Sequence, residues 1–245
     1  YLIGYGTSAA LWTGSIFVDQ PQMFYLWGAG LIIDLVTPFT IYKYQLRLPR
    51  LNISHITERY GLFIILVLGE SVIALVAGAS ALHGVTFSVM VTCTLGLVLA
   101  FGMWWLYFGH ISHARKDNLP LHYAVYGWMH LPLIISLGAM GAATLNVVAH
   151  GTHDVPDEAL SLACGALATA LVSMGIIRMA IEGPPLYRSI GVLFIGAAVA
   201  LAIAYTAQYV DAFTLLSMLC LLVYLLIIHR IWNDNKYMVA QEATA

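Results

Sequence analysis

The sequence predicts an all-α protein that crosses a membrane about eight times and has a cytoplasmic C-terminus, and three observations indicate this fold class. Hydrophobic residues make up 61% of its 245 residues and charged residues only 9%, with a mean hydropathy of +0.86. Apolar segments of about 20 residues, the length that crosses the hydrocarbon core as a helix, follow one another along the chain. Basic residues occur only in alternate gaps between these segments, as in a chain threaded repeatedly through a bilayer.

The predicted helices are placed where the apolar run is long enough to span about 30 Å at about 1.5 Å per residue. In chain order, they are expected near residues 1–18, 22–43, 57–78, 84–108, 121–149, 157–181, 186–209 and 211–232. The first begins inside an apolar stretch, with neither a Met nor a charged leader, so we expect upstream helices that this chain lacks. Two proline residues in Gly183-Pro184-Pro185 end the sixth, because neither can continue the helical hydrogen bonding.

Charges in the gaps assign the sides of the bilayer. The acidic and histidine-containing gaps, which include Asp19, His83 and Asp211, alternate with cationic gaps and are expected outside. The cationic gaps, expected in the cytoplasm, hold Lys43, Arg47, Arg50, Arg59, Arg115, Lys116, Arg178, Arg188, Arg230 and Lys236. Connections are short except for segment 44–56, so residues 1–245 are predicted to form a single transmembrane domain.

Composition also sets several classes of function aside. The net charge of -2 leaves no basic stripe for nucleic acid. The cysteines are three and widely separated within apolar runs, which favours small buried side chains over a disulfide or metal cluster. No lysine lies inside a predicted span to carry a retinal Schiff base, and only one deep histidine is available for haem. We therefore predict no cofactor and no metal, with the lipid bilayer as the expected partner.

Three ionisable residues are predicted near the middle of the membrane. Asp34 and Glu70 are the only carboxylates deep within spans, where a charge costs about 2.5 kcal/mol or more. Counting from the inner helix ends, Asp34 and His130 lie about 14 Å deep and Glu70 about 20 Å deep. A carboxylate pair or a histidine at this depth can hold a proton or a cation, so these residues are candidates for transport or relay. A structural hydrogen bond of Glu70 to a neighbouring helix is the alternative.

Polar residues at the inner end of the third predicted helix form a second candidate group. His55 and Arg59 are four residues apart on one face, and Glu58 complements the positive helix terminus. Arg59 and Glu70 share a face but are about 16 Å apart along the helix, so they cannot pair directly. Trp105 and Tyr107 lie near the inner end of the fourth predicted helix, where aromatic rings form either a belt at the headgroups or a lining toward a substrate.

Small residues recur at helical spacing and are expected where helices approach closely. They are Gly138, Gly141 and Ala142 in the fifth predicted helix, Gly165 and Thr169 in the sixth, and Gly191, Gly196 and Ala197 in the seventh.

Four stretches of the sequence resemble the signature of the bacterial low temperature requirement protein A family. They are residues 55–63, 68–71, 104–108 and 130–132. The resemblance implies a multi-pass protein of the bacterial inner membrane, and members usually begin with an acidic, aromatic helix that this sequence lacks. Positions that match the family pattern are His55, Glu58, Arg59, Gly69, Glu70, Trp105, Tyr107 and His130. Glu70 and His130 are therefore selected by the resemblance as well as by their depth.

These observations lead to one hypothesis and two alternatives. The leading hypothesis is a secondary transporter or channel for protons, cations or a small solute, with Glu70 as the titrating group and His130 and Asp34 as its relay partners. An enzyme acting on lipid or an isoprenoid carrier, with His55, Glu58 and Arg59 at its site, is the first alternative. A sensor or assembly protein without transport is the second. The sequence leaves open whether the chain forms a homo-oligomer.

Overall fold

The computed structural model describes residues 2–40, 53–81, 86–111, 120–150, 155–182, 187–207 and 210–242. These ranges contain eight α-helices and one short 3-10 helix, η1. In chain order they are α1 Leu2–Gly14, η1 Ser15–Phe17, α2 Gln22–Thr40, α4 Ile53–Ala81, α5 Phe87–Ile111, α6 Pro120–His150, α7 Asp157–Glu182, α8 Tyr187–Thr206 and α9 Ala212–Glu242. The predicted all-α class and the number of helices are confirmed. Gly183-Pro184-Pro185 lies outside the described residues, directly after the end of α7.

Five helices of the described part, α4, α5, α6, α7 and α9, are long and apolar enough to cross a membrane. Two shorter apolar helices cover Gln22–Thr37 and Ile190–Thr206. The predicted helix boundaries agree closely with the observed ones, and the largest difference is in α9, which continues past Trp232 to Glu242. Hydropathy locates an apolar run well but cannot detect a polar helical extension beyond it.

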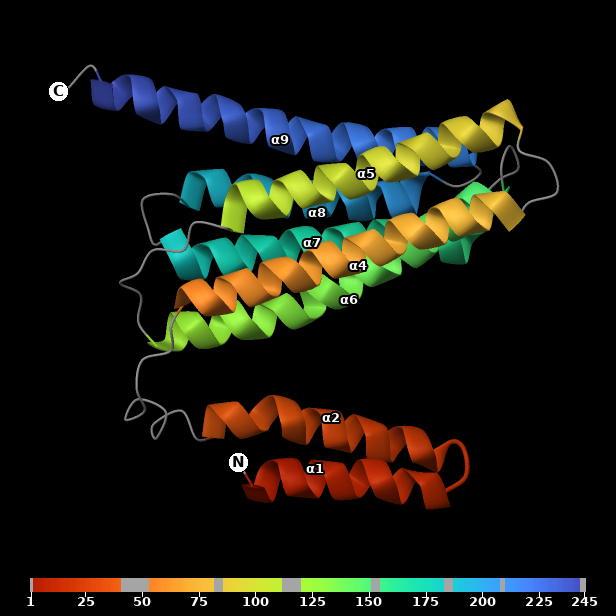
Figure 1. Ribbon diagram of the computed structural model, residues 1–245, viewed down its shortest axis with the longest axis vertical. Helices are drawn as coiled ribbons and strands as arrows, with labels where there is room; N and C mark the ends of the chain where they lie inside the picture. Colours follow the sequence, from red (N-terminus) through yellow and green to blue (C-terminus); the bar gives the residue numbers. More distant parts are fainter. Residues whose placement is uncertain are drawn as a thin grey trace. The chain divides into compact units, whose positions relative to one another are not determined.

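The first unit of the chain, residues 1–51, contains the antiparallel hairpin of α1 and α2 (Figure 1). Near the connection, the rings of Trp12 and Trp27 stack with their centroids 5.9 Å apart. The Trp27 indole donates a hydrogen bond of 2.8 Å to the hydroxyl of Ser15. Gly30 lets the Trp12 ring lie close to α2, because a Cβ atom at this position would lie 2.8 Å from Nε1 of Trp12.

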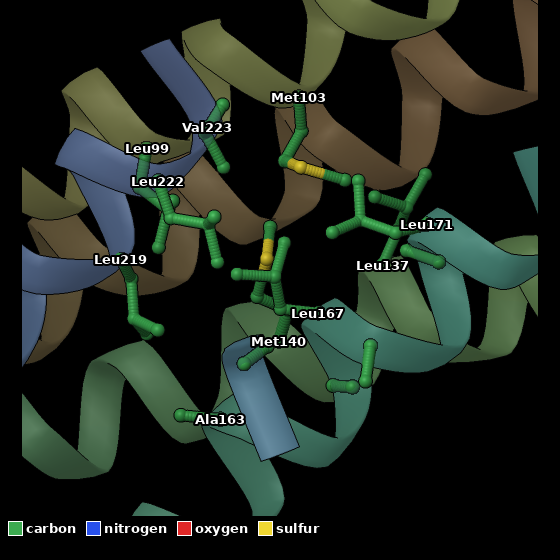
Figure 2. Packing of buried hydrophobic residues seen from close by; sticks show 14 of the residues in the cluster. Leu99, Met103, Leu137, Met140, Ala163, Leu167, Leu171, Leu219, Leu222 and Val223 are labelled. Atoms are coloured by element: carbon green, nitrogen blue, oxygen red, sulfur yellow. The ribbon is translucent and has the colours of Figure 1, made fainter. Parts of the chain in front are cut away.

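Residues 52–245 form the second unit, in which α4 to α9 lie side by side as a bundle (Figure 1). α7 packs against α6 and α8, α5 packs against α9, and α4 packs against α6 and α5. Figure 2 shows the apolar core where α5, α6, α7 and α9 meet, with Met103, Leu137, Leu167 and Leu219 among its fully buried side chains. Because each unit is compact by itself, the prediction of one domain stays a prediction.

α4 and α6 run in the same direction and approach closely at small residues. Ser71 of α4 lies against Gly141 of α6, where a Cβ atom would overlap the Ser71 hydroxyl and lie 3.3 Å from its Cα atom. Gly138 and Gly196 also face neighbouring helices, so these three predicted small-residue contacts are confirmed. In contrast, a Cβ atom on Gly165 or Gly191 would meet nothing within 4 Å, so these two glycines do not mark close contacts.

We predict that Gly141→Ala destabilises the protein by about 1–3 kcal/mol, because the added methyl group overpacks the contact with Ser71. Gly165→Ala is the matched control, since it makes the same change where a Cβ atom has space. Thermal unfolding in detergent measures both variants. Equal midpoints for the two would show that α4 can move away from α6 without cost.

Candidate functional site

The candidate site is centred on His130 of α6, whose side chain is fully buried. Its Nδ1 atom lies 2.6 Å from the backbone carbonyl oxygen of Tyr126, one helical turn earlier. Its Nε2 atom lies 3.0 Å from the hydroxyl of Tyr107, on α5. Both imidazole nitrogens therefore have hydrogen-bond partners in the interior of the bundle, as a buried polar side chain requires.

These two contacts define the neutral tautomer of His130. A carbonyl oxygen can only accept a hydrogen bond, so Nδ1 carries the proton and donates it to Tyr126. Nε2 is then the acceptor, and the hydroxyl of Tyr107 must be the donor. The free lone pairs of the Tyr107 oxygen remain available to a further donor.

Three tyrosine rings surround the imidazole of His130. The Tyr60 ring, from α4, stacks on it with centroids 4.1 Å apart and an interplanar angle of 24°. The Tyr126 ring is tilted at 50° with its centroid 4.5 Å away, and the Tyr107 ring lies edge-on at 5.8 Å. Rings from α4, α5 and α6 thus enclose the imidazole.

Two further hydroxyl groups lie beside this cluster. Among the described residues, Tyr126 Oη and Thr57 Oγ1 are buried and have no partner in hydrogen-bonding geometry. The site thus combines one imidazole with three neighbouring tyrosines, Tyr60 of α4, Tyr107 of α5 and Tyr126 of α6.

A proline distorts the helix next to the site. Pro132 lies inside α6, two residues after His130, and has no N–H to donate to the carbonyl of Trp128. α6 therefore lacks one helical hydrogen bond next to His130.

Glu70 does not belong to this cluster. Its side chain is exposed on α4 between Leu66 and Ile73, which are 64% and 63% exposed. It lies ten residues, or about 15 Å along the helix axis, beyond Tyr60, whose ring stacks on His130. The structure therefore does not bring Glu70 and His130 together, and the role of Glu70 in transport stays a prediction.

Asp34 has its own partner inside the first unit. The hydroxyl of Ser8, which is only 2% exposed, lies 2.7 Å from Oδ2 of Asp34. The same hydroxyl also lies 3.2 Å from the carbonyl oxygen of Gly30. This contact joins α1 to α2 at the carboxylate. Since Asp34 and Glu70 belong to different units, a proton shared between them also stays a prediction.

The polar residues at the start of α4 lie on its surface. Nδ1 of His55 and Oε2 of Glu58 are 4.0 Å apart, and their side chains are 71% and 70% exposed. Arg59 is exposed as well. Such an exposed ion pair contributes little to stability, so this group is accessible rather than structural.

The two aromatic residues predicted as a belt or a lining are separated by the structure. Trp105 is 44% exposed and lies against Phe101 and Trp104 on the outer face of α5. Tyr107, two residues later, is only 2% exposed and faces His130. Trp105 thus faces outward and Tyr107 faces the interior of the bundle, and a role of Trp105 in an aromatic belt stays a prediction.

Among the residues that the structure describes, no group of three His, Cys, Asp or Glu side chains could hold a metal ion.

The sequence matches that of a known protein family. The chain matches the family of the bacterial low temperature requirement A protein, LtrA, over residues 1–239. The chain belongs to the LtrA family. Its membership and its five long apolar helices make it a membrane protein. No curated protein and no solved structure resembles this LtrA chain significantly.

Sequence reasoning missed several residues of this LtrA protein. Tyr126 could have been found, because it lies four residues before His130 and thus on the same helical face. Thr57 and Tyr60 lie within the family signature but gave no chemical signal of their own. Arg178, which we interpreted as a residue of a cytoplasmic gap, is fully buried near the end of α7. A charge pattern places Arg178 toward one side of the membrane but cannot show that it faces the bundle interior.

We predict that Tyr107→Phe destabilises this LtrA protein by about 1–3 kcal/mol, because Nε2 of His130 loses its donor in a buried position. Tyr205→Phe makes the same chemical change at a side chain that is 83% exposed and serves as the control. Thermal unfolding in detergent compares the two variants. If both have the wild-type midpoint, the hydrogen bond between Tyr107 and His130 contributes nothing to stability.

Proposed function

We propose that this LtrA protein is a secondary transporter or channel that moves protons, cations or a small solute across the bacterial inner membrane. The observation that carries the proposal is the fully buried imidazole of His130, hydrogen-bonded to Tyr107 inside one of the long apolar helices. Ionisable side chains inside membrane helices are costly and mostly mark ion or proton pathways.

The surroundings of His130 support a change of charge at this residue. Nδ1–H is held by the Tyr126 carbonyl, so the ring orientation is set while Nε2 remains able to gain a proton. An imidazolium would lie against the faces of Tyr60 and Tyr126, each of which offers a cation–π contact.

We propose that Glu70 and Asp34 each take part in the transport as well. Glu70 lies on an apolar face of α4, where an ionised carboxylate costs about 2.5–3.5 kcal/mol unless it is protonated or paired. Asp34 accepts a hydrogen bond from Ser8, which offsets part of the cost of removing its carboxylate from water. We propose that each carboxylate exchanges a proton or contacts a cation during transport. The described helices would have the N-terminal ends of α4 and α6 in the cytoplasm.

We predict that Glu70→Gln reduces pH-driven flux in proteoliposomes at least tenfold, because the amide cannot exchange the proton or hold the cation. The protein is reconstituted as the full-length chain, and flux is followed with a pH-sensitive dye and with cation-selective electrodes. Glu158→Gln is the matched control, since this exposed glutamate lies in the first turn of α7, outside the proposed pathway.

Two results would contradict the proposed function. One is wild-type flux in a Glu70→Gln variant that unfolds at the wild-type temperature, which would remove Glu70 from the pathway. The other is the absence of flux through the wild-type protein under any imposed gradient, which would remove transport itself.

A second candidate function is an enzyme acting on lipid or an isoprenoid carrier. It is favoured by the accessible group of His55, Glu58 and Arg59, in which an acid, a base and a phosphate-binding cation lie within two turns of α4. Altered lipid composition on deletion of the protein, restored by the wild type but not by Arg59→Gln, would support it. Unchanged lipids would count against it.

A further inference from the structure

We propose that α4 bends at Gly69, so that its N-terminal half, residues 53–68, moves away from α6 and opens a path to His130. The inference rests on the proposed function and supplies the moving part that a transporter with a buried site requires. Tyr60 is the residue of this half that covers His130, and its hydroxyl fastens the half to α6.

A fully buried site needs a neighbouring element that moves. The side chain of His130 has no exposed surface, so a proton, cation or solute reaches it only when one of the helices around it shifts. These helices are α4, α5 and α6, which contribute Tyr60, Tyr107 and His130 itself. In the described part of the chain, 17% of the apolar stretch of α4 is buried, against 39% in α5 and 50% in α6. α4 therefore loses the least packing when it moves.

α5 and α6 are each held in place by a further helix. The thiol of Cys220 and the hydroxyl of Tyr224, both on α9, donate to the carbonyl oxygens of Leu95 and Val98 on α5, each over 3.3 Å. α6 packs against α7, which packs against α8 in turn. The helices that carry Tyr107 and His130 are thus fixed, which leaves α4 as the wall that opens.

A hydrogen bond of Tyr60 holds the N-terminal half of α4 to α6. The hydroxyl of Tyr60 donates to the carbonyl oxygen of Gly127 over 3.3 Å, while its ring stacks on His130. Two oxygen atoms that share a hydrogen bond are usually about 2.7–2.8 Å apart, so this bond is a weak link. Water that enters as the helices separate can replace it at the hydroxyl and at the carbonyl. When the bond opens, the ring leaves the face of the imidazole.

The C-terminal half of α4, in contrast, is locked to α6. Ser71 meets Gly141 so closely that a Cβ atom on the glycine would overlap its hydroxyl. Two turns later, a Cβ atom on Gly78 would overlap Cδ1 of Leu145, also on α6. Close packing of this kind holds helices together in lipid. The C-terminal half therefore stays on α6, and the pivot of the movement lies before Ser71.

Gly69 lies at this pivot and has no packing role. A Cβ atom there would meet nothing within 4 Å, so an alanine would fit equally well. Glycine weakens the interior of a helix because its backbone adopts other conformations readily, and helices bend sharply at such positions. The flexibility of Gly69 is thus the property that the movement uses. Glu70 is the next residue, so the bend also turns this carboxylate relative to α6.

We predict that Gly69→Ala slows flux at least tenfold in proteoliposomes of the full-length protein, because alanine stiffens α4 at the pivot without a clash. The variant is expected to unfold at the wild-type temperature or above it, which separates a lost movement from a damaged fold. Gly165→Ala is the matched control, since it places the same methyl group in open space on a different helix, α7. Wild-type flux in Gly69→Ala would overturn the pivot.

Distances between spin labels measure the movement independently of flux. Labels are attached to single introduced cysteines in a cysteine-free background, reconstituted in lipid nanodiscs. The N-terminal pair is Leu62 and Met179, which are exposed on α4 and α7 at the end of the bundle where α4 begins. The C-terminal pair, Ile73 and Leu162, reports the other half of α4 against the same helix. The two pairs together distinguish a bend from a movement of the whole helix.

We predict that Tyr60→Phe adds a longer distance to the N-terminal pair and leaves the C-terminal pair unchanged, because it removes only the hydroxyl that binds α6. A bend of about 20° at Gly69 moves Leu62, about 10 Å away along the axis, by about 4 Å. Adding Gly69→Ala to Tyr60→Phe is expected to restore the wild-type distance. Tyr205→Phe, at a side chain that is 83% exposed, is the control.

The outcomes separate the bend from the proposed function. An unchanged N-terminal pair in Tyr60→Phe would overturn the inference, and so would an equal lengthening of both pairs, which means that α4 moves as a rigid body. Flux that still depends on Glu70 would leave the transporter in place in either case. A longer N-terminal pair alone, combined with no flux through any variant or the wild type, would overturn transport and support the bend.

Discussion

The close approach of α4 to α6 is the contact on which the candidate site depends. Without a hydrophobic force between helices in lipid, only close packing and polar contacts hold the two helices together. Gly141 lets Ser71 come near, and the same register brings the Tyr60 ring onto His130. α5 then completes the site with Tyr107. A larger side chain at the glycine would separate the helices and with them the rings and the imidazole.

Polar groups in this protein fall into two kinds of environment. His130 is fully buried, yet both of its nitrogens have partners and its faces meet tyrosine rings. Glu70 lies on an apolar outer face of α4, where only protonation or a covering partner would reduce its cost. The interior site is therefore preorganised, whereas the carboxylate depends on what surrounds the helix in the membrane.

In the structure the candidate site is centred on His130 and its tyrosine neighbours, and not on the carboxylates of Glu70 and Asp34. Depth alone made Glu70 and His130 look like partners, but the register of α4 and α6 separates them by about 15 Å along the axis. Asp34 is bonded to Ser8 within its own hairpin. What remains close to His130 is a set of tyrosine rings and the Tyr107 hydroxyl.

The sequence by itself determined the all-α class and the number of helices, because hydrocarbon demands long apolar runs and helices satisfy their backbone groups locally. Only the tertiary structure decided which way each side chain faces. Trp105 and Tyr107 are two residues apart in the same apolar helix, but one lies outside and the other inside. Helices that are apolar on all sides carry almost no directional signal, so packing between helices had to select Thr57, Tyr60 and Tyr126 as neighbours of His130.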